Sequence, residues 1–138
     1  MAGADASLPL QIAVVAALKG NSAVQAIVSD RVFDRVPKDA VKPYISIGPS
    51  QVTPELADEY DASRERFQVD GWSSDPGRRQ IKTLGAVIRA ALHGAALTLE
   101  GDQRLVFLEI EQTQYLPDPD GLTLHAAVVF TAGTEPSA

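Results

Sequence analysis

The sequence has 138 residues, a length that suits one domain, with 45% hydrophobic and 22% charged residues. It has no cysteine, which excludes disulfides and thiolate metal sites and fits synthesis in a reducing cytoplasm. The net charge of −6 argues against stable binding to nucleic acid, because an acidic protein gains nothing from the counterions that DNA releases. We expect no signal peptide, because the N-terminus lacks a basic segment followed by an apolar run with a cleavage site. We also expect no membrane association, since the longest apolar run, Ile12 to Leu18, is too short to span a bilayer.

The first 28 residues predict two helices. Ser7 is a suitable N-cap for the first helix, and Gly20 is a natural stop. Its apolar residues at helical spacing are Leu8, Ile12, Val15 and Leu18. Asn21 or Ser22 can cap a shorter helix through Val28.

Residues 29–43 predict an irregular segment, because Pro37 and Pro43 interrupt it. Its apolar side chains are expected to pack against the core: Val32, Phe33 and Val36. Tyr44 to Gly48 alternates with period two and predicts a strand. The inward residues of this strand are Ile45 and Ile47.

Residues 53–63 predict an exposed acidic loop between two strands. A loop of this length is usually functional or disordered, so a recognition element and a solvated tether both stay open. The next strand is expected from Arg64 to Asp70, with its charges outward, Phe67 and Val69 inward, and Trp72 closing it.

Ser74, Asp75 and Pro76 predict the start of a long helix that ends at Gly94. Its apolar stripe consists of Ile81, Leu84, Ile88 and Leu92. Its solvent side carries Arg78, Arg79, Lys82 and Arg89. His93 lies in the last turn, where the helix dipole favours a cation.

The C-terminal third predicts a hairpin. Leu105 to Tyr115 forms a long strand with Val106, Leu108 and Ile110 on one face, and residues 117–121 have the composition of a turn. Alternating apolar residues from Leu122 to Phe130 predict the last strand. A disordered tail is expected from Gly133, so that one domain over residues 1–138 has an ordered core of about 7–132 and flexible termini.

The order helix, strand, strand, helix, strand, strand predicts an α+β domain. We expect a mainly antiparallel four-stranded sheet with two amphipathic helices packed on one face. The predicted core residues are Ile45, Ile47, Phe67, Val69, Ile81, Leu84, Ile88, Val106, Leu108, Leu124, Val128 and Phe130.

A metal site near the hairpin turn is one alternative, because Asp118 and Asp120 could join Glu109 and Glu111 around a hard cation. The spacing of a calcium loop is absent, and the two glutamates alternate with inward residues. The pattern therefore favours a solvated turn and no metal site.

The two histidines, His93 and His125, raise the alternative of a nucleophile site with Ser46, Ser73 or Ser74. No Gly-x-Ser-x-Gly elbow is present, and the glycines around Trp72 do not have the spacing of a phosphate loop. His125 is expected on the outer face of the sheet. The sequence favours no catalytic residue, and a small hydrolase, a metal-dependent enzyme or a soluble binding module remain the rivals.

Four segments and the long helix follow one another in an order that carries a resemblance. The segments are Leu8 to Leu18, Asp30 to Pro37, Lys42 to Gly48 and Phe67 to Ser73, and the helix contains Ile81, Ile88 and Leu92. Over about residues 8–131 the sequence resembles the tail-completion, or tail-terminator, family of long-tailed phages and phage-like gene transfer agents. Pro43, Tyr44 and Trp72 match its motif and are interpreted as packing residues.

The resemblance implies a non-enzymatic structural protein located in the tail of a virion or phage-like particle. Such a protein forms a homo-hexameric ring at the head-proximal end of the tail tube, stops tube polymerisation and joins the tail to the head-side connector. Its partners would be the tail tube protein and a head-tail connector or stopper protein, while DNA passes through without specific binding. No cofactor is implied. A connector or stopper ring subunit stays open as the alternative.

A closed ring requires two different patches on each subunit that complement each other. The acidic loop and the basic side of the long helix are the candidate patches. The candidate interface residues are Glu55, Asp58, Glu59, Tyr60, Asp61, Arg64, Arg78, Arg79, Lys82 and Arg89.

Overall fold

The computed structural model describes residues 5–57 and 60–137. Its elements are α1 (Ser7–Lys19), α2 (Ser22–Val28), β1 (Val32–Phe33), β2 (Tyr44–Ala57), β3 (Tyr60–Ser73), α3 (Arg79–Leu92), β4 (Gln103–Pro117) and β5 (Leu124–Pro136). The strands form one sheet in the order β1-β2-β3-β5-β4, in which only β1 and β2 run parallel. The predicted α+β class is confirmed. The sheet has five strands instead of the four expected, and the domain has three helices instead of two packed on the sheet.

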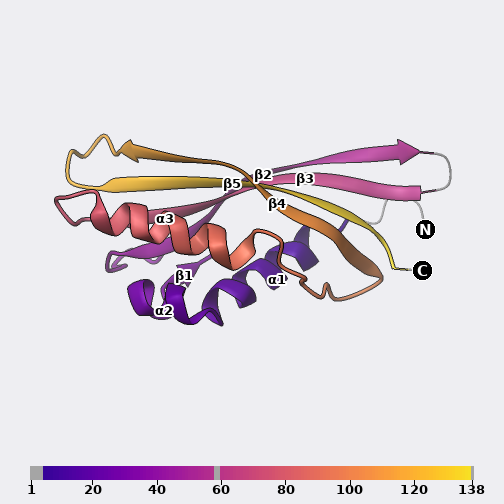
Figure 1. Cartoon of the computed structure of the whole chain (residues 1–138), viewed down its shortest axis with the longest axis horizontal. Helices are drawn as coiled ribbons and strands as arrows, with labels where there is room; N and C mark the ends of the chain where they lie inside the picture. Colours follow the sequence, from indigo (N-terminus) through magenta and orange to yellow (C-terminus); the bar gives the residue numbers. More distant parts are fainter. Residues whose placement is uncertain (1–4, 58–59, 138) are drawn as a thin grey trace.

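The three helices lie on one face of the sheet (Figure 1). We call the other face the open face. It presents Arg64, Arg66, Asp70 and Trp72 of β3 and His125, Thr131 and Glu135 of β5, because strand residues alternate between faces and Gly71 lies against Leu84 of α3. Within the described residues no single helix is long and apolar enough to cross a membrane; only the pair α1 and α2, bent by 77°, passes by length and composition.

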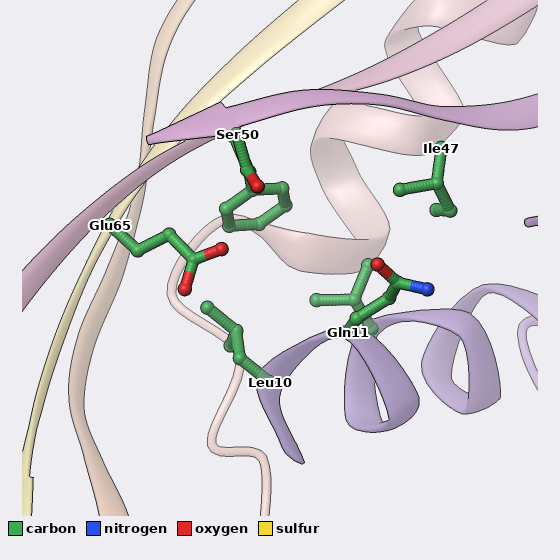
Figure 2. Close-up of a pocket in the computed structure, with 7 residues that line it drawn as sticks. Leu10, Gln11, Ile47, Ser50 and Glu65 are labelled. Atoms are coloured by element: carbon green, nitrogen blue, oxygen red, sulfur yellow. The ribbon is translucent and has the colours of Figure 1, made fainter. Parts of the chain in front are cut away.

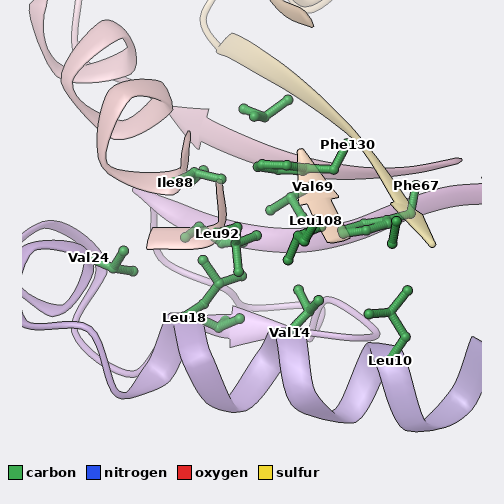
Figure 3. Close-up of a cluster of buried hydrophobic side chains, with 14 of the residues drawn as sticks. Leu10, Val14, Leu18, Val24, Phe67, Val69, Ile88, Leu92, Leu108 and Phe130 are labelled. Carbon is green, nitrogen blue, oxygen red and sulfur yellow. The ribbon is translucent and has the colours of Figure 1, made fainter. Parts of the chain in front are cut away.

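The core lies between the helices and the sheet (Figure 3). The stripe of α3 is buried as predicted, and Phe67 stacks on Phe130 with ring centroids 5.4 Å apart. The predicted stripe of α1 is wrong for Leu8 and Ile12, which are exposed. Leu18 is buried as predicted, together with Leu10 and Val14. Val106 is also misassigned: it sits at a register shift in β4 and is 50% exposed.

The β2–β3 hairpin is much longer than predicted. Strand pairing continues from Thr53 and Arg64 to Ala57 and Tyr60, so residues 53–57 and 60–63 are strand and not loop. Asp58 and Glu59 lie outside the described residues. β5 accompanies β3 only as far as Ser63, so residues 54–57 and 60–62 form a two-stranded ribbon that extends past the helices (Figure 1). A ribbon outside the core needs no apolar alternation, so its sequence has the composition of a loop.

The last strand also continues further than predicted. β5 runs to Pro136, and Gly133 and Thr134 are buried, so the predicted disordered tail is wrong over these residues. Gly133 lies under the ring of Phe107, where any Cβ atom would overlap the ring. At the other end, Leu122 precedes the strand and is exposed.

Several predicted boundaries shift for local reasons. Ser7 is inside α1 rather than at its N-cap, and its backbone N–H donates to Asp5 Oδ1 at 2.7 Å. α3 begins at Arg79, because Ser73 Oγ accepts from the Asp75 N–H at 3.1 Å and holds the preceding residues in a turn. Val36, predicted in the core, is 37% exposed.

β4 is the edge strand next to α3, and the end of the helix covers part of its outer side. The Gly94 N–H donates to the Leu108 carbonyl at 2.7 Å, and the Ile110 N–H donates to His93 Nδ1 at 3.0 Å. These bonds satisfy backbone groups that an uncovered edge would expose. His93 therefore ties the C-terminus of α3 to the sheet.

Candidate functional site

Three arginines of the open face each bind a glutamate on another strand. The nitrogen–oxygen distances are 2.5 Å for Arg64–Glu55, 3.0 Å for Arg66–Glu111 and 2.7 Å for Arg104–Glu135. All six side chains are partly exposed, so each pair contributes little to stability. Their consequence is electrostatic: the positive charge of each guanidinium is cancelled at the surface.

A row of rings crosses the open face at the end where β2 begins. His125 lies flat on Trp72 with centroids 4.0 Å apart, and Tyr44 is 6.4 Å from Trp72 on the other side. Trp72 Nε1 donates to Ser46 Oγ at 2.9 Å, and His125 Nε2 is 2.5 Å from Asp70 Oδ1. The prediction that His125 faces outward is confirmed, and both aromatic residues of the family motif belong to this packed row.

Within this row the polar groups bind one another. Ser46 is engaged by the indole of Trp72, and His125 is held by Asp70. Burial and, to a smaller extent, the negative charge of Asp118 raise the pKa of the Tyr44 hydroxyl, which keeps it protonated at neutral pH.

Among the strand glutamates that the structure describes, only Glu65 points its side chain into the helical side. Figure 2 shows its carboxylate in a small pocket between α1 and the β2–β3 hairpin, close to Leu10 and Ser50. It is 6% exposed and accepts a hydrogen bond from Ser7 Oγ at 2.9 Å. Burial raises its pKa, the charge of Asp5 adds to this, and the hydrogen bonds from Ser7 and Ser50 oppose it.

The prediction that the charges of this strand all face outward is therefore wrong for Glu65. Strand alternation was the signal that could have found it, because Glu65 shares its parity with the inward residues Phe67 and Val69.

The acidic residues near the β4–β5 turn do not converge. Asp120 accepts hydrogen bonds from Thr123 Oγ1 and from the backbone N–H groups of Leu122 and Thr123, which lower its pKa. Glu109 and Glu111 are exposed on the sheet. Within the described residues no three His, Asp or Glu side chains gather as metal ligands would.

The predicted interface residues fall into two groups, one on the β2–β3 ribbon and one on α3, which begins at the opposite end of the sheet (Figure 1). On the ribbon, Glu55 pairs with Arg64. Tyr60 and Asp61 belong to β3 without a described side chain, and Asp58 and Glu59 lie outside the described residues. On α3, the exposed cations form what we call the basic row: Arg78, Arg79, Lys82 and Arg89. In the part of the chain that the structure describes, none of the basic row forms an ion pair.

Comparison with known proteins decides the family. The sequence profile described as "Tail completion protein gp17" matches residues 12–135. The chain belongs to this family. It is also similar to a chain in the structure titled "Virion of native gene transfer agent (GTA) particle", with 26% identity, a TM-score of 0.88, and coverage of 94% of this chain and 97% of that chain. Among curated proteins, no sequence matches it.

The resemblance to tail-completion proteins of phages and gene transfer agents is thus confirmed. As a member of this family, the tail completion protein has a structural role in a tail of the phage type, and it contacts other proteins of the tail or head.

One surface feature of the tail completion protein adjoins the basic row. A groove runs between α3 and the free side of β4, lined by small helical residues and by Arg89, His93 and Tyr115. Lys82 Nζ lies 5.5 Å from the centroid of the Tyr115 ring at the same place. The sequence indicates the cations but not the groove, since its two walls are at least twenty residues apart in the chain.

Proposed function

We propose that this tail completion protein is a tail terminator. Six copies form a ring that caps the tail tube at its head-proximal end, stops tube polymerisation and joins the tail to the head-side connector. Membership of the family and the similarity to a gene transfer agent chain support the tail role. The ring is supported by one observation above others: α3, which carries the basic row, begins at the end of the sheet opposite the β2–β3 ribbon, whose sequence is acidic (Figure 1).

Patches that differ in this way favour a head-to-tail contact, which produces a closed ring when the rotation between subunits closes. The basic row of one subunit would face the ribbon end of the next. Its cations are exposed, and none forms an ion pair with a carboxylate of the described residues. Acidic residues of a neighbouring subunit can therefore pair with them without breaking an internal ion pair. Glu55 is already bound to Arg64, which leaves Asp58, Glu59 and Asp61 as the complementary charges.

The proposed role is structural and needs no cofactor. The tube protein and a connector or stopper protein are the neighbours along the tail axis, and DNA passes through the ring. The protein would be made in the bacterial cytoplasm and retained in the finished particle.

Reversing the charges of one patch at a time tests the contact. A variant with Arg78→Glu, Arg79→Glu and Lys82→Glu should stay monomeric, as should a variant with Asp58→Lys, Glu59→Lys and Asp61→Lys. Combining both sets, or mixing the two variants, should restore rings, because the pairing is re-created with opposite signs. Mass photometry measures the assembly state, and circular dichroism confirms the fold.

A matched control reverses three exposed cations outside the basic row, with Lys19→Glu, Arg35→Glu and Lys38→Glu, and should assemble normally. Failure of the combined variant to form rings would remove this contact from consideration. In particles that lack the protein, tails of uncontrolled length support a terminator, whereas tails of normal length without heads would identify a connector or stopper.

A further inference from the structure

The open face balances its charges differently from the helical side. Its strands carry three arginines, each paired with a glutamate, and Asp70 and Glu109 bring the carboxylates to five, so the sum is 3 − 5 = −2 with His125 neutral. Uncharged amides lie among them: Gln51, Gln68, Gln112 and Gln114. The helical side instead carries the basic row, which has no ion-pair partner among the described residues.

The pairs are set by strand register and not by nearness in the chain. Arg66 on β3 reaches across β5 to Glu111 on β4, and Thr131 of β5 donates to the same carboxylate at 2.8 Å. These hydrogen bonds lower the pKa of Glu111, and the bond from Arg66 has the largest effect. Glu111 is therefore negatively charged at neutral pH.

The arginines also cover apolar surface that no helix protects. Val129 and Ala127 of β5 point to the open face and are nevertheless only 3% and 5% exposed. Arg66 and Gln68 lie beside Val129 with their long side chains. The aliphatic part of an arginine side chain can cover such residues, but its guanidinium adds a positive charge to the surface. The paired glutamate balances this charge.

Charge decides which face DNA can pass without adhering to it. Duplex DNA binds proteins mainly through contacts between phosphates and free cations, because each contact releases counterions. The helical side carries unpaired cations, whereas every arginine that the structure describes on the open face is neutralised.

We propose that the open face lines the DNA passage of the ring, and that Glu55, Glu111 and Glu135 prevent its arginines from binding the phosphates of the passing duplex. This inference rests on the ring of the proposed function. The three glutamates act as an anti-adhesive layer, and the occupant of the passage is double-stranded DNA of any sequence.

The direct test neutralises the three carboxylates without changing their shape. The variant Glu55→Gln, Glu111→Gln, Glu135→Gln changes the balance of the open face from −2 to 3 − 2 = +1. With three arginines available, binding to a random duplex should fall about 40-fold between about 50 and 200 mM salt, as a slope of about −2.7 requires. Fluorescence anisotropy should show at least about tenfold tighter binding than the wild type at the lower salt concentration.

Two controls locate the binding. Asp75→Asn, Glu100→Gln and Asp102→Asn change the net charge equally at exposed positions outside the strands and should not increase affinity to the same extent. The gain should also persist when the basic row is neutralised by Arg78→Gln, Arg79→Gln, Lys82→Gln and Arg89→Gln. An equal gain in the first control, or loss of the gain in the second background, would overturn the assignment to the open face.

Particles test the passage itself. Tails carrying the Glu→Gln variant should keep their normal length and join heads, while DNA delivery falls. If the variant binds duplex DNA in solution but delivers DNA normally, the open face does not line the DNA passage. The terminator role is tested separately, by measuring tail length in particles that lack the protein.

Discussion

The imidazole of His125 lies parallel to the indole of Trp72, with 4.0 Å between ring centroids and 4° between ring planes. Asp70 holds the other side of the histidine at 2.5 Å, and Ser46 accepts from the indole. One chain of contacts therefore links β2, β3 and β5 on a face that no helix covers. The stability of this end of the sheet should depend on the histidine.

His125→Ala should destabilise the domain by about 1–3 kcal/mol, because it removes the stack and leaves the largely buried Asp70 carboxylate without its partner. Trp72 is the only tryptophan, so a red shift of the emission reports this site. Urea unfolding measures the cost. In a double-mutant cycle with Asp70→Asn, additive effects within about 0.5 kcal/mol would show that the two residues are not coupled.

Glu65→Gln should make the protein more stable than the wild type at neutral pH. Burial raises the folded-state pKa of Glu65 above its ordinary 4.5, so the folded protein holds this proton more tightly than the unfolded chain. The resulting stability is fully present below pH 4.5 and is lost as the pH rises through the raised pKa.

Glutamine keeps an acceptor for Ser7 and never ionises. The stability difference between variant and wild type should therefore be largest at neutral pH and disappear as the pH falls below 4.5, as unfolding curves across this range would measure. Glu100→Gln, at an exposed position, controls for the general loss of a negative charge. A difference that does not change with pH would exclude ionisation as its cause.

Gly85→Ala should destabilise the protein even though alanine favours a helix by about 1 kcal/mol. Gly85 is in the middle of α3, and a Cβ atom there would overlap the Tyr115 side chain of β4. In a Tyr115→Ala background the obstacle is gone, and the same substitution should become stabilising. Thermal unfolding of the wild type, the two single variants and the double variant measures the effect of Gly85→Ala in each background. Destabilisation in both backgrounds would mean that the Tyr115 side chain is not the reason for glycine at this position.

Leu84→Ala and Leu108→Ala should each cost about 2–5 kcal/mol, since both side chains are fully buried between α3 and the sheet. Val106→Ala is the matched control in the same strand as Leu108, and its cost should stay within about 0.5 kcal/mol because Val106 is half exposed. Chemical denaturation gives these values. An unchanged midpoint for either leucine variant would show that its segment is not part of the core.

The parts of the fold that the sequence predicts are those with a strong local period. The stripe of α3 repeats at helical spacing and is buried at every predicted position. Ile45 and Phe67 belong to segments in which apolar residues alternate, and both are buried as predicted. The α1 stripe was misplaced, since the helix is apolar on most sides and its period does not select a face.

Long-range pairing decides the parts that were missed. Gly133 has no strand character of its own and interrupts the apolar alternation, yet β3 and β4 pair with it and with Thr134 from both sides. The open-face ion pairs join residues 9, 45 and 31 positions apart, so no local pattern could match each arginine with its glutamate. The cations of α3, by contrast, were found because one helix presents them all.

The position of β5 has a consequence for how the chain acquires its structure during translation. β5 is the last element of the domain to leave the ribosome, but it lies between β3 and β4 and contributes Val128 and Phe130 to the core. Until it emerges, β4 lacks the strand with which it pairs in the described structure, and α3 lacks one of the three strands against which it packs. The nascent chain therefore exposes apolar surface until β5 is synthesised. Insertion of β5 between β3 and β4 is a late, non-local pairing step, and steps of this type are slow in folding.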